Sequence, residues 1–413
     1  MSLAVGALVG VVALAFRYVR EHAFVEVVLL ILGLGVGALI CAYWEPIAQY
    51  LTENGKGEPI AMADGVSVWP TILLRSLGII LFVNFFLRVV RGLQTNLEEI
   101  AAELGLRPMP EPLLRQLTGS QKYSLTFWKM IRSLFDTFRH NDETARNEPL
   151  DVEAAWRTYV GRERIWPRCG RAALYTAFIF GIFIYVLSPM FGMPNHAARG
   201  TFASNVQFWT TIGYVLCMHF LNFLVFDATL SCLRFVNKLR RAQSIWPQAT
   251  IGVYRGRLRL QTKLVHDWID LDFVAKRTTC IGWLIYYPFV LIALLIVSRS
   301  TIFANYAPSL TILIAQGISL SIVFSCAIML WWVARATRDL AKQNLTEGMI
   351  RAKDAESNLR LAEQLETLLA QVAQLNRGAF SPLSQQPVVK ALLFPLSSAG
   401  WVALIENGTI PGF

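Results

Sequence analysis

The hydrophobic positions of this chain occur in long uninterrupted blocks, not in the alternating or amphipathic stripes that are typical of soluble domains. Seven blocks are long enough to cross about 30 Å of hydrocarbon as a helix that rises about 1.5 Å per residue. The pattern therefore predicts an all-α, polytopic membrane protein with about seven transmembrane helices. The blocks cover approximately residues 3–19, 24–44, 69–90, 172–191, 206–230, 280–298 and 309–333.

The segments between these blocks differ sharply in positive charge, and this difference governs membrane orientation. With the N-terminus outside, 34 of the 38 lysines and arginines fall on the cytoplasmic side and 3 on the outer side, while Arg75 lies inside the third span. We therefore expect an outside N-terminus and a cytoplasmic C-terminus. No basic residue precedes the first block, so we expect a retained helix and not a cleaved signal peptide.

This topology divides the chain into membrane and cytoplasmic segments. The expected order is transmembrane helices 1–3 (1–90), a cytoplasmic helical segment (91–171), transmembrane helices 4–5 (172–231), a basic cytoplasmic segment (232–279), transmembrane helices 6–7 (280–334), a cytoplasmic helix (335–376) and a linker with an apolar C-terminal segment (377–413). That apolar segment is expected to lie at the membrane interface. An eighth span over 388–405 is the alternative.

The region after the seventh span is predicted to continue it as one helix. From Arg335 to about Asn376 there is no proline and one glycine, and good helix formers are abundant. Its distal part carries apolar residues at spacings of four and three, namely Leu361, Leu365, Leu368, Val372 and Leu375. Because the stripe spans only about two heptads, a short coiled coil and packing on the chain's other cytoplasmic helices are both open.

The composition supports a lipid environment and limits the other classes of function. Of the 413 residues, 54% are hydrophobic and only 16% are charged, which is low for a soluble surface. The net charge of +10 is explained by the cytoplasmic loops, so no nucleic-acid partner is expected. The six cysteines are scattered without a CxxC pair, which predicts neither a disulfide framework nor a zinc site.

Motifs of soluble enzymes are missing from the sequence. It contains no phosphate-binding GxxxxGK[ST] loop, no GxGxxG, no HExxH and no GxSxG. The densest group of potential metal ligands is His266, Asp267, Asp270 and Asp272, whose spacing matches neither a calcium loop nor a zinc site. We expect these residues to form a solvated acidic face. The sequence therefore predicts no metal, no cofactor and no catalytic residue.

Polar side chains inside the spans carry more information, because a charge at the centre of a transmembrane helix costs at least about 2.5–3.5 kcal/mol. The candidates are Arg75, Asn84, His219, Asn222, Asp227 and Gln316. They predict a hydrated path or pocket within the bundle. The alternatives are hydrogen bonds that hold the helices together for His219 and Asn222, an outward-reaching side chain for Arg75, and contact with the inner interface for Asp227. His219 and Asp227 are the strongest candidates, because an imidazole and a carboxylate can exchange protons or bind cations.

A basic stretch follows the fifth span directly. Arg234, Lys238, Arg240 and Arg241 are candidates for contact with anionic lipids, each contributing on the order of 1 kcal/mol near an anionic leaflet. Control of topology by positive charge explains the same stretch equally simply.

One tripeptide occurs twice in the segments expected to be cytoplasmic. Ile165-Trp166-Pro167 and Ile245-Trp246-Pro247 have the same sequence 80 positions apart. Tryptophans near lipid headgroups are ordinary interfacial anchors, and this role for Trp166 and Trp246 explains the repeat without a duplicated transporter fold.

The sequence leads to two functional hypotheses. The first is an oligomeric channel or pore-like protein, gated or assembled through its cytoplasmic helices, with lipids and copies of itself as partners. The alternative is a membrane-anchored sensor or scaffold that recruits a soluble cytoplasmic protein without conducting. A membrane enzyme is less favoured, because His219 and Asp227 lack a catalytic partner. We expect the membrane to be the inner (plasma) membrane of a bacterium.

Overall fold

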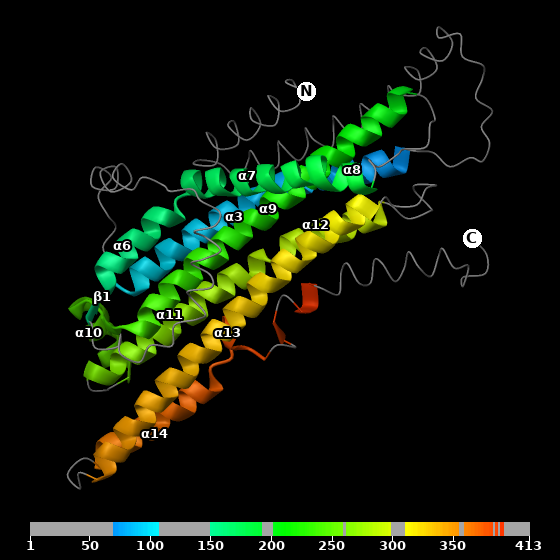
Figure 1. Cartoon of the computed structure of the whole chain (residues 1–413). Helices are drawn as coiled ribbons and strands as arrows, with labels where there is room; N and C mark the ends of the chain where they lie inside the picture. Colours follow the sequence, from blue (N-terminus) through cyan, green and yellow to red (C-terminus); the bar gives the residue numbers. More distant parts are fainter. Residues whose placement is uncertain are drawn as a thin grey trace, which may run out of the picture.

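The computed structural model describes residues 69–106, 149–191, 201–258, 262–298, 310–354, 359–382, 385–386 and 389–391. Over these residues the protein is an elongated, almost entirely helical bundle (Figure 1). Five stretches are long and apolar enough to cross a membrane: Leu74–Glu103, Ile165–Leu187, Phe208–Arg241, Val265–Val297 and Ile314–Asp354. The protein is therefore an all-α integral membrane protein.

These five stretches correspond to the third to seventh predicted spans. The first two predicted spans, 3–19 and 24–44, and most of the predicted apolar C-terminal segment lie outside the described residues. The count of seven spans, the orientation of the termini and the bacterial inner membrane therefore stay predictions.

The helices and strands follow one another along the chain with the labels of Figure 1. They are α3 (Trp69–Glu103), β1 (Pro149–Asp151), α6 (Val152–Glu163), α7 (Ile165–Ile182), the π-helix η2 (Phe183–Leu187), α8 (Ser188–Phe191), α9 (Thr201–Arg241), β2 (Gln243–Ile245), α10 (Gln248–Leu258), α11 (Thr262–Leu284), α12 (Tyr286–Val297), α13 (Leu310–Asp354), α14 (Leu359–Gln374) and the 3-10 helix η4 (Gly378–Phe380).

Helix α9 occupies the centre of the bundle. It packs against α3, α6, α7, α11, α12 and α13. In its most apolar window 83% of the residues are buried, against 22% for the stretch that contains α7, so the other described helices shield α9 much more fully than α7. Its inward residues, among them Leu221, Leu224 and Val225, are completely buried. The axis of the described bundle is therefore filled by a helix.

Three helices are much longer than a membrane crossing requires. Helices α3, α9 and α13 contain 35, 41 and 45 residues, or about 52, 61 and 67 Å at 1.5 Å per residue. None of them breaks at the segment boundaries expected after residues 90, 231 and 334. Helix α3 ends where Gly105 adopts a φ of +60° and the Leu106 N–H donates to the carbonyl of Ala101 at 2.9 Å, a glycine-dependent helix stop.

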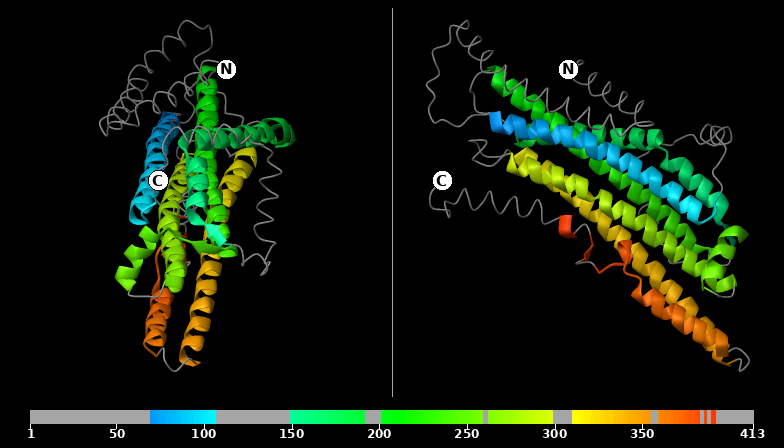
Figure 2. Two further views of the ribbon diagram at one scale, coloured as in Figure 1. Left: turned by 90° about the vertical axis from the view of Figure 1, so that its left-hand side faces the viewer. Right: turned by 180° about the vertical axis from the view of Figure 1, so that it is seen from behind.

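The predicted single helix over 335–376 is instead a helical hairpin. Helix α13 ends at Asp354, and α14 runs back along it, so that Arg338 donates to the carbonyls of Leu375 and Phe380 (Figure 2). The apolar stripe of α14 faces α13 within the same chain, and Leu365, Leu368 and Val372 are buried. Packing on the chain's own helices therefore accounts for the stripe.

A short parallel pairing of β1 with β2 joins two distant parts of the chain and was not expected from the sequence. Leu150 lies opposite Ser244, which places the start of α6 beside the end of α9. The next residue, Asp151, caps α6 by accepting hydrogen bonds from the N–H groups of Glu153 at 2.9 Å and Ala154 at 3.3 Å. The position of α6 is thus fixed at its first turn.

Candidate functional site: a buried ionic cluster and its neighbours along α9

Five charged side chains meet where α6 passes into α7: Glu163, Arg168, Arg171, Asp227 and Arg277. Glu163, at the end of α6, is completely buried and pairs with the guanidinium groups of Arg168 and Arg277. Asp227, on α9, receives two hydrogen bonds of 2.7 Å from Arg171, and the Arg168 Nε lies 3.5 Å from it. We call this group the ionic cluster.

Arg277 extends the ionic cluster to two further helices. Its side chain is fully buried on α11, and its Nε donates to the Tyr159 hydroxyl at 2.8 Å. Its Nη1 donates to the Asn96 side-chain oxygen at 2.9 Å and to the Leu93 carbonyl at 3.3 Å, both on α3. Burial raises the pKa of Tyr159 well above its ordinary value of 10.0, so the phenol stays protonated and neutral.

The charges of the ionic cluster do not cancel, because three guanidinium groups face two carboxylates. Each carboxylate is held by at least two arginines, and removal of one partner from such a buried pair is costly because it leaves an uncompensated charge. With the contacts of Arg277, the cluster joins α3, α6, α7, α9 and α11. Its geometry is suited to fixing the mutual positions of these helices.

The sequence pointed to one member of this cluster and missed the others. Asp227 was expected to face a hydrated path or to reach the inner interface, and the structure places it against α7 arginines. Glu163, Arg168 and Arg171 surround the first Trp-Pro pair, and a carboxylate among arginines just before an apolar block is the signal that could have indicated them. Arg277 gives no such local signal.

His219 forms a second polar contact, between α9 and α13. Its Nδ1 lies 2.8 Å from the Val215 carbonyl and its Nε2 lies 3.0 Å from the Ser319 hydroxyl. Because a carbonyl only accepts, Nδ1 carries the hydrogen, and Nε2 of the neutral ring then accepts from Ser319. The imidazole therefore bridges the two helices.

Asn222 and Gln316 lie in the same interface, one turn from His219 and Ser319 respectively. Asn222 is completely buried and Gln316 nearly so. Within the described ranges, neither polar atom of the Asn222 amide nor Nε2 of Gln316 has a hydrogen-bond partner. Polar groups buried in this way cost about 1–3 kcal/mol each, so these two residues do not contribute to stability in this arrangement.

A cavity of about 100 Å³ borders His219 between α7, η2, α9 and α13. Apart from His219 and Thr176 it is lined by apolar side chains such as Phe183, Leu187 and Val215. An apolar cavity of this size stays dry. It therefore does not supply a hydrated path to the imidazole, although π-helical turns such as η2 are frequent at functional sites.

Arg75 makes the third polar contact of α9. It is 1% exposed, and its Nη1 donates to the Thr211 hydroxyl at 2.6 Å, which joins α3 to α9. Thr211, His219 and Asp227 follow one another at intervals of eight residues, or about 12 Å along the helix. Such intervals are too long for direct proton transfer from one group to the next. Asn84, the other candidate on α3, is half-buried.

The four lipid-facing basic candidates differ in exposure. Lys238 is exposed, whereas Arg234, Arg240 and Arg241 are half-buried. The Arg240 guanidinium lies over the ring of Trp332, 5.9 Å from its centre. Part of this basic stretch therefore packs on α13.

The repeated Trp-Pro tripeptide serves two different purposes. Trp166 is 66% exposed, as an interfacial anchor would be, but Trp246 is buried at 1% exposure. The Trp246 indole donates to Asp270 at 2.8 Å, and the Ser244 hydroxyl donates to the same carboxylate at 2.7 Å. The prediction that Asp270 belongs to a solvated acidic face is therefore wrong.

Asp267 and Asp272, also predicted to belong to the acidic face, contact separate partners. Asp272 accepts from the Tyr254 hydroxyl at 2.5 Å and pairs with Lys276 at 2.7 Å, and Asp267 accepts from Asn344 at 3.2 Å. Over the part of the chain that the structure describes, no three metal-ligating side chains come together.

No protein-family model matches the sequence, and comparisons with curated proteins and with solved structures find no match either. The function is therefore inferred from the geometry of the chain itself. That geometry consists of a filled bundle axis, polar contacts of α9 with α3 and α13 through Thr211 and His219, and an ionic cluster that joins five helices.

Proposed function

We propose that the protein is a membrane-anchored sensor or scaffold, in which long helices connect the spans rigidly to a helical domain that recruits a soluble partner. The observation that carries this proposal is the continuity of α3, α9 and α13 beyond the length of a membrane crossing. A helix without a break transmits rotation and displacement along its axis. The ionic cluster fixes three more elements to the same framework.

The arrangement of polar groups favours this function over conduction through a single chain. Arg75, His219 and Asp227 each bond to a neighbouring helix. Interhelical hydrogen bonds of this kind contribute about 0.6 kcal/mol each on average, and they hold a bundle together without any transport role. The cavity beside His219 is apolar, and α9 fills the axis.

The α13–α14 hairpin is the surface that we assign to the partner. It extends farther from the apolar spans than the other described helices (Figure 1). Its outer face mixes acidic and basic side chains, such as Glu366 and Arg351, with the apolar Ile350, which is 52% exposed. An apolar centre with a polar rim is the usual anatomy of a protein interface.

Site-specific photo-crosslinking in intact cells tests this assignment. A photoreactive amino acid replaces Glu366, exposed on α14, and in a matched control it replaces Tyr185, which is 81% exposed on the apolar η2 segment. We expect discrete protein adducts at position 366 that mass spectrometry identifies, and none at position 185. Equal adduct patterns at both positions, together with ion flux from the purified protein in liposomes, would contradict the proposal.

An oligomeric channel is the second candidate, and one observation favours it. Gly317, Ser321 and Ser325 recur every four residues on α13, and the first two are exposed. Both serine hydroxyls bond to carbonyls of their own helix at 2.8 and 2.7 Å. Small residues at this spacing favour close packing of transmembrane helices, which would put any path between subunits.

Liposome flux assays distinguish the two candidates. A channel between subunits predicts flux from the wild type that Ser321→Trp abolishes, and altered flux from Asp227→Asn or from a chain truncated after Arg377. A scaffold predicts no flux from any of these proteins. Each protein is first checked by size-exclusion chromatography in detergent, so that aggregation is not mistaken for loss of function.

A further inference from the structure

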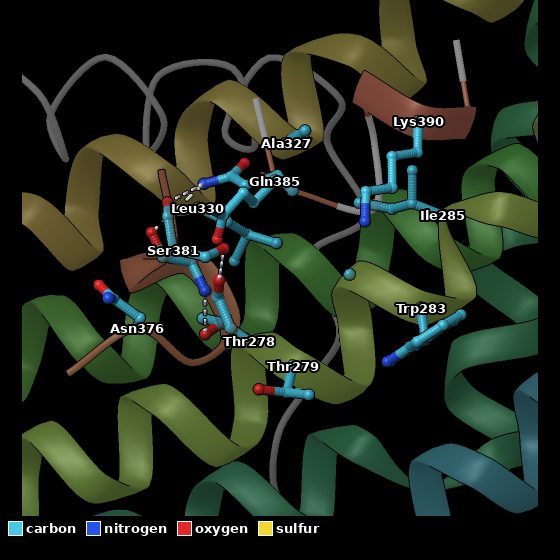
Figure 3. A pocket seen from close by; sticks show the side chains of 14 residues that line it. Thr278, Thr279, Trp283, Ile285, Ala327, Leu330, Asn376, Ser381, Gln385 and Lys390 are labelled. Carbon is cyan, nitrogen blue, oxygen red and sulfur yellow. Dashed lines mark hydrogen bonds between the residues drawn. The ribbon is translucent and has the colours of Figure 1, made fainter. Parts of the chain in front are cut away.

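A cavity of about 280 Å³, lined by polar and apolar residues in similar measure, lies between α11, α13 and the end of the described chain (Figure 3). Its outer wall is a segment that we call the C-terminal strap, made of residues 375–382, 385–386 and 389–391. The Ala379 N–H donates to the Thr278 hydroxyl at 3.0 Å, and the Gln386 side chain donates to the carbonyls of Ala379 and Ser381 at 3.3 Å. The strap is therefore attached to α11 and bonded within itself.

Gly378 brings the strap close enough to α11 to shape this cavity. Its φ is +60°, a conformation that L-residues with a Cβ adopt rarely. A Cβ at this position would lie 2.5 Å from both the Ala275 carbonyl oxygen and the Thr278 hydroxyl oxygen. A side chain therefore does not fit here unless the strap moves away from α11.

The hydroxyl groups around the cavity already bond to protein acceptors. Thr278 donates to the Val274 carbonyl at 2.6 Å, Thr279 to the Ala275 carbonyl at 2.7 Å and Ser381 to the Gly378 carbonyl at 2.7 Å. These groups build the wall, and their hydrogens are not available to a ligand.

Two other donors are available. The Lys390 ammonium and the Trp283 indole N–H turn toward the cavity in Figure 3, and neither has a hydrogen-bond acceptor among the residues that the structure describes. Exposed amide groups of Asn376 and Gln385 add further donors at the rim. None of the described residues that line the cavity is acidic. The cavity therefore carries a net positive charge and suits an anion.

We propose that this cavity binds a phosphate group, with Lys390 and Trp283 as its principal donors. A compact phosphate head fits the volume, which lies just below the usual range of about 300–1,000 Å³ for drug-sized ligands. An ammonium beside N–H donors is a common phosphate-binding arrangement.

The surroundings of the cavity favour a phospholipid headgroup as the source of that phosphate. Trp283 is 61% exposed and stacks on Tyr286, with ring centres 5.4 Å apart. Tyr286 opens α12, whose sequence from Phe289 to Val297 is entirely apolar. Exposed aromatic rings at the end of an apolar span are typical of the headgroup level of a bilayer. A headgroup in the cavity would leave its acyl chains beside α12.

Lipid binding to the full-length protein in detergent tests the proposal. Native mass spectrometry counts bound short-chain phosphatidylglycerol on the wild type and on the Lys390→Gln, Trp283→Phe and Gly378→Ala variants. Lys353→Gln, the same change at an exposed lysine of α13, is the matched control. We expect one tightly bound lipid on the wild type and the control, with affinity reduced about fivefold to tenfold in Lys390→Gln. Trp283→Phe should reduce it severalfold.

Inorganic phosphate and phosphatidylcholine distinguish the possible sources. A phospholipid site predicts that millimolar phosphate does not displace the lipid, and that phosphatidylcholine binds more weakly than phosphatidylglycerol. Displacement by phosphate that requires Lys390 would support the same site with a soluble phosphate as ligand. Two results would overturn the proposal. Neither probe binds the wild type, or Lys390→Gln and Trp283→Phe leave the affinities for both probes unchanged.

Protein stability is recorded for every variant, because Gly378→Ala can displace the strap. Lys390 is exposed, so Lys390→Gln should leave the melting temperature unchanged and keep the test decisive even where the glycine variant fails to fold.

Discussion

Arg171 holds Asp227 through two parallel hydrogen bonds, Nε to Oδ1 and Nη2 to Oδ2, each 2.7 Å long. Such a bidentate pair fixes both the distance and the orientation of α7 relative to α9. A third bond, from Arg171 to the Arg162 carbonyl at 3.0 Å, extends this restraint to α6.

Asp227→Asn should destabilise the protein by about 3 kcal/mol, because it leaves the half-buried Arg171 without a counter-charge and the buried Arg168 with Glu163 as its remaining carboxylate. Reversible unfolding in mixed SDS micelles measures the difference. Arg157→Ala is the control, since its pair with Glu153 is substantially exposed and contributes less than about 1 kcal/mol. Equal effects of the two changes would contradict the structural role of the ionic cluster.

Trp246→Phe should cost about 1–3 kcal/mol, because it leaves the buried Asp270 with one fewer hydrogen-bond donor. The same change at Trp166, which is 66% exposed, should alter stability by less than about 0.5 kcal/mol. Melting temperatures of the two variants in one detergent make the comparison. A larger loss at Trp166 would show that the two tripeptides had been assigned the wrong roles.

Gly378→Ala should loosen the C-terminal strap, because the added methyl group would meet the Ala275 carbonyl. We expect a loss of more than about 1 kcal/mol and faster protease cleavage after Arg377. Gly256→Ala is the matched control on α10, where a Cβ meets nothing within 4 Å. That change should stabilise the helix by about 0.5–1 kcal/mol.

Ser319→Ala should cost about 0.6 kcal/mol, the average for a hydrogen bond between membrane helices, because it removes the donor to His219. Ser321→Ala, two residues away, should have no measurable effect, since its hydroxyl bonds within α13. The free energy of unfolding in the same micelles separates the two variants. A substantial loss from Ser321→Ala alone would reveal a contact of this outward face with another helix.

Leu368→Ala should destabilise the α13–α14 hairpin by about 2–4 kcal/mol, because the side chain is buried within the chain. Light scattering coupled to size-exclusion chromatography should give the same mass for the variant and the wild type. A smaller assembly in the variant would show that the stripe also joins separate chains.

The hydrophobic blocks were sufficient to predict the class of fold, because the length and apolarity of a span are local properties. The reversal after Asp354 could not be predicted in the same way. A stripe such as Leu361, Leu365 and Leu368 specifies that an apolar partner exists, but not whether the partner is another chain or the preceding helix. The break between α11 and α12 does have a local cause, because Pro288 lies in the first turn of α12, where a proline is tolerated.

The candidate site was predictable only in part. Asp227 was selected because a carboxylate in a span is costly, whereas its partner Arg171 lies 56 positions away on another helix. The pairing of Glu163 with Arg277 bridges 114 positions. Contacts of this kind depend on how the helices pack. The residues between the two partners carry no pattern from which the pairing could be predicted.

The separation of Glu163 from Arg277 also sets an order of events during synthesis. At roughly 5–20 residues per second, the 114 intervening positions take about 6 to 23 s to emerge from the ribosome. Helix α7 is made at the start of this interval, and until α11 follows, Arg168 is the member of the ionic cluster with which Glu163 can pair. The ionic cluster is complete only once Arg277 on α11 has been made. The last of its helices to be translated therefore fixes the positions of the helices that were made before it.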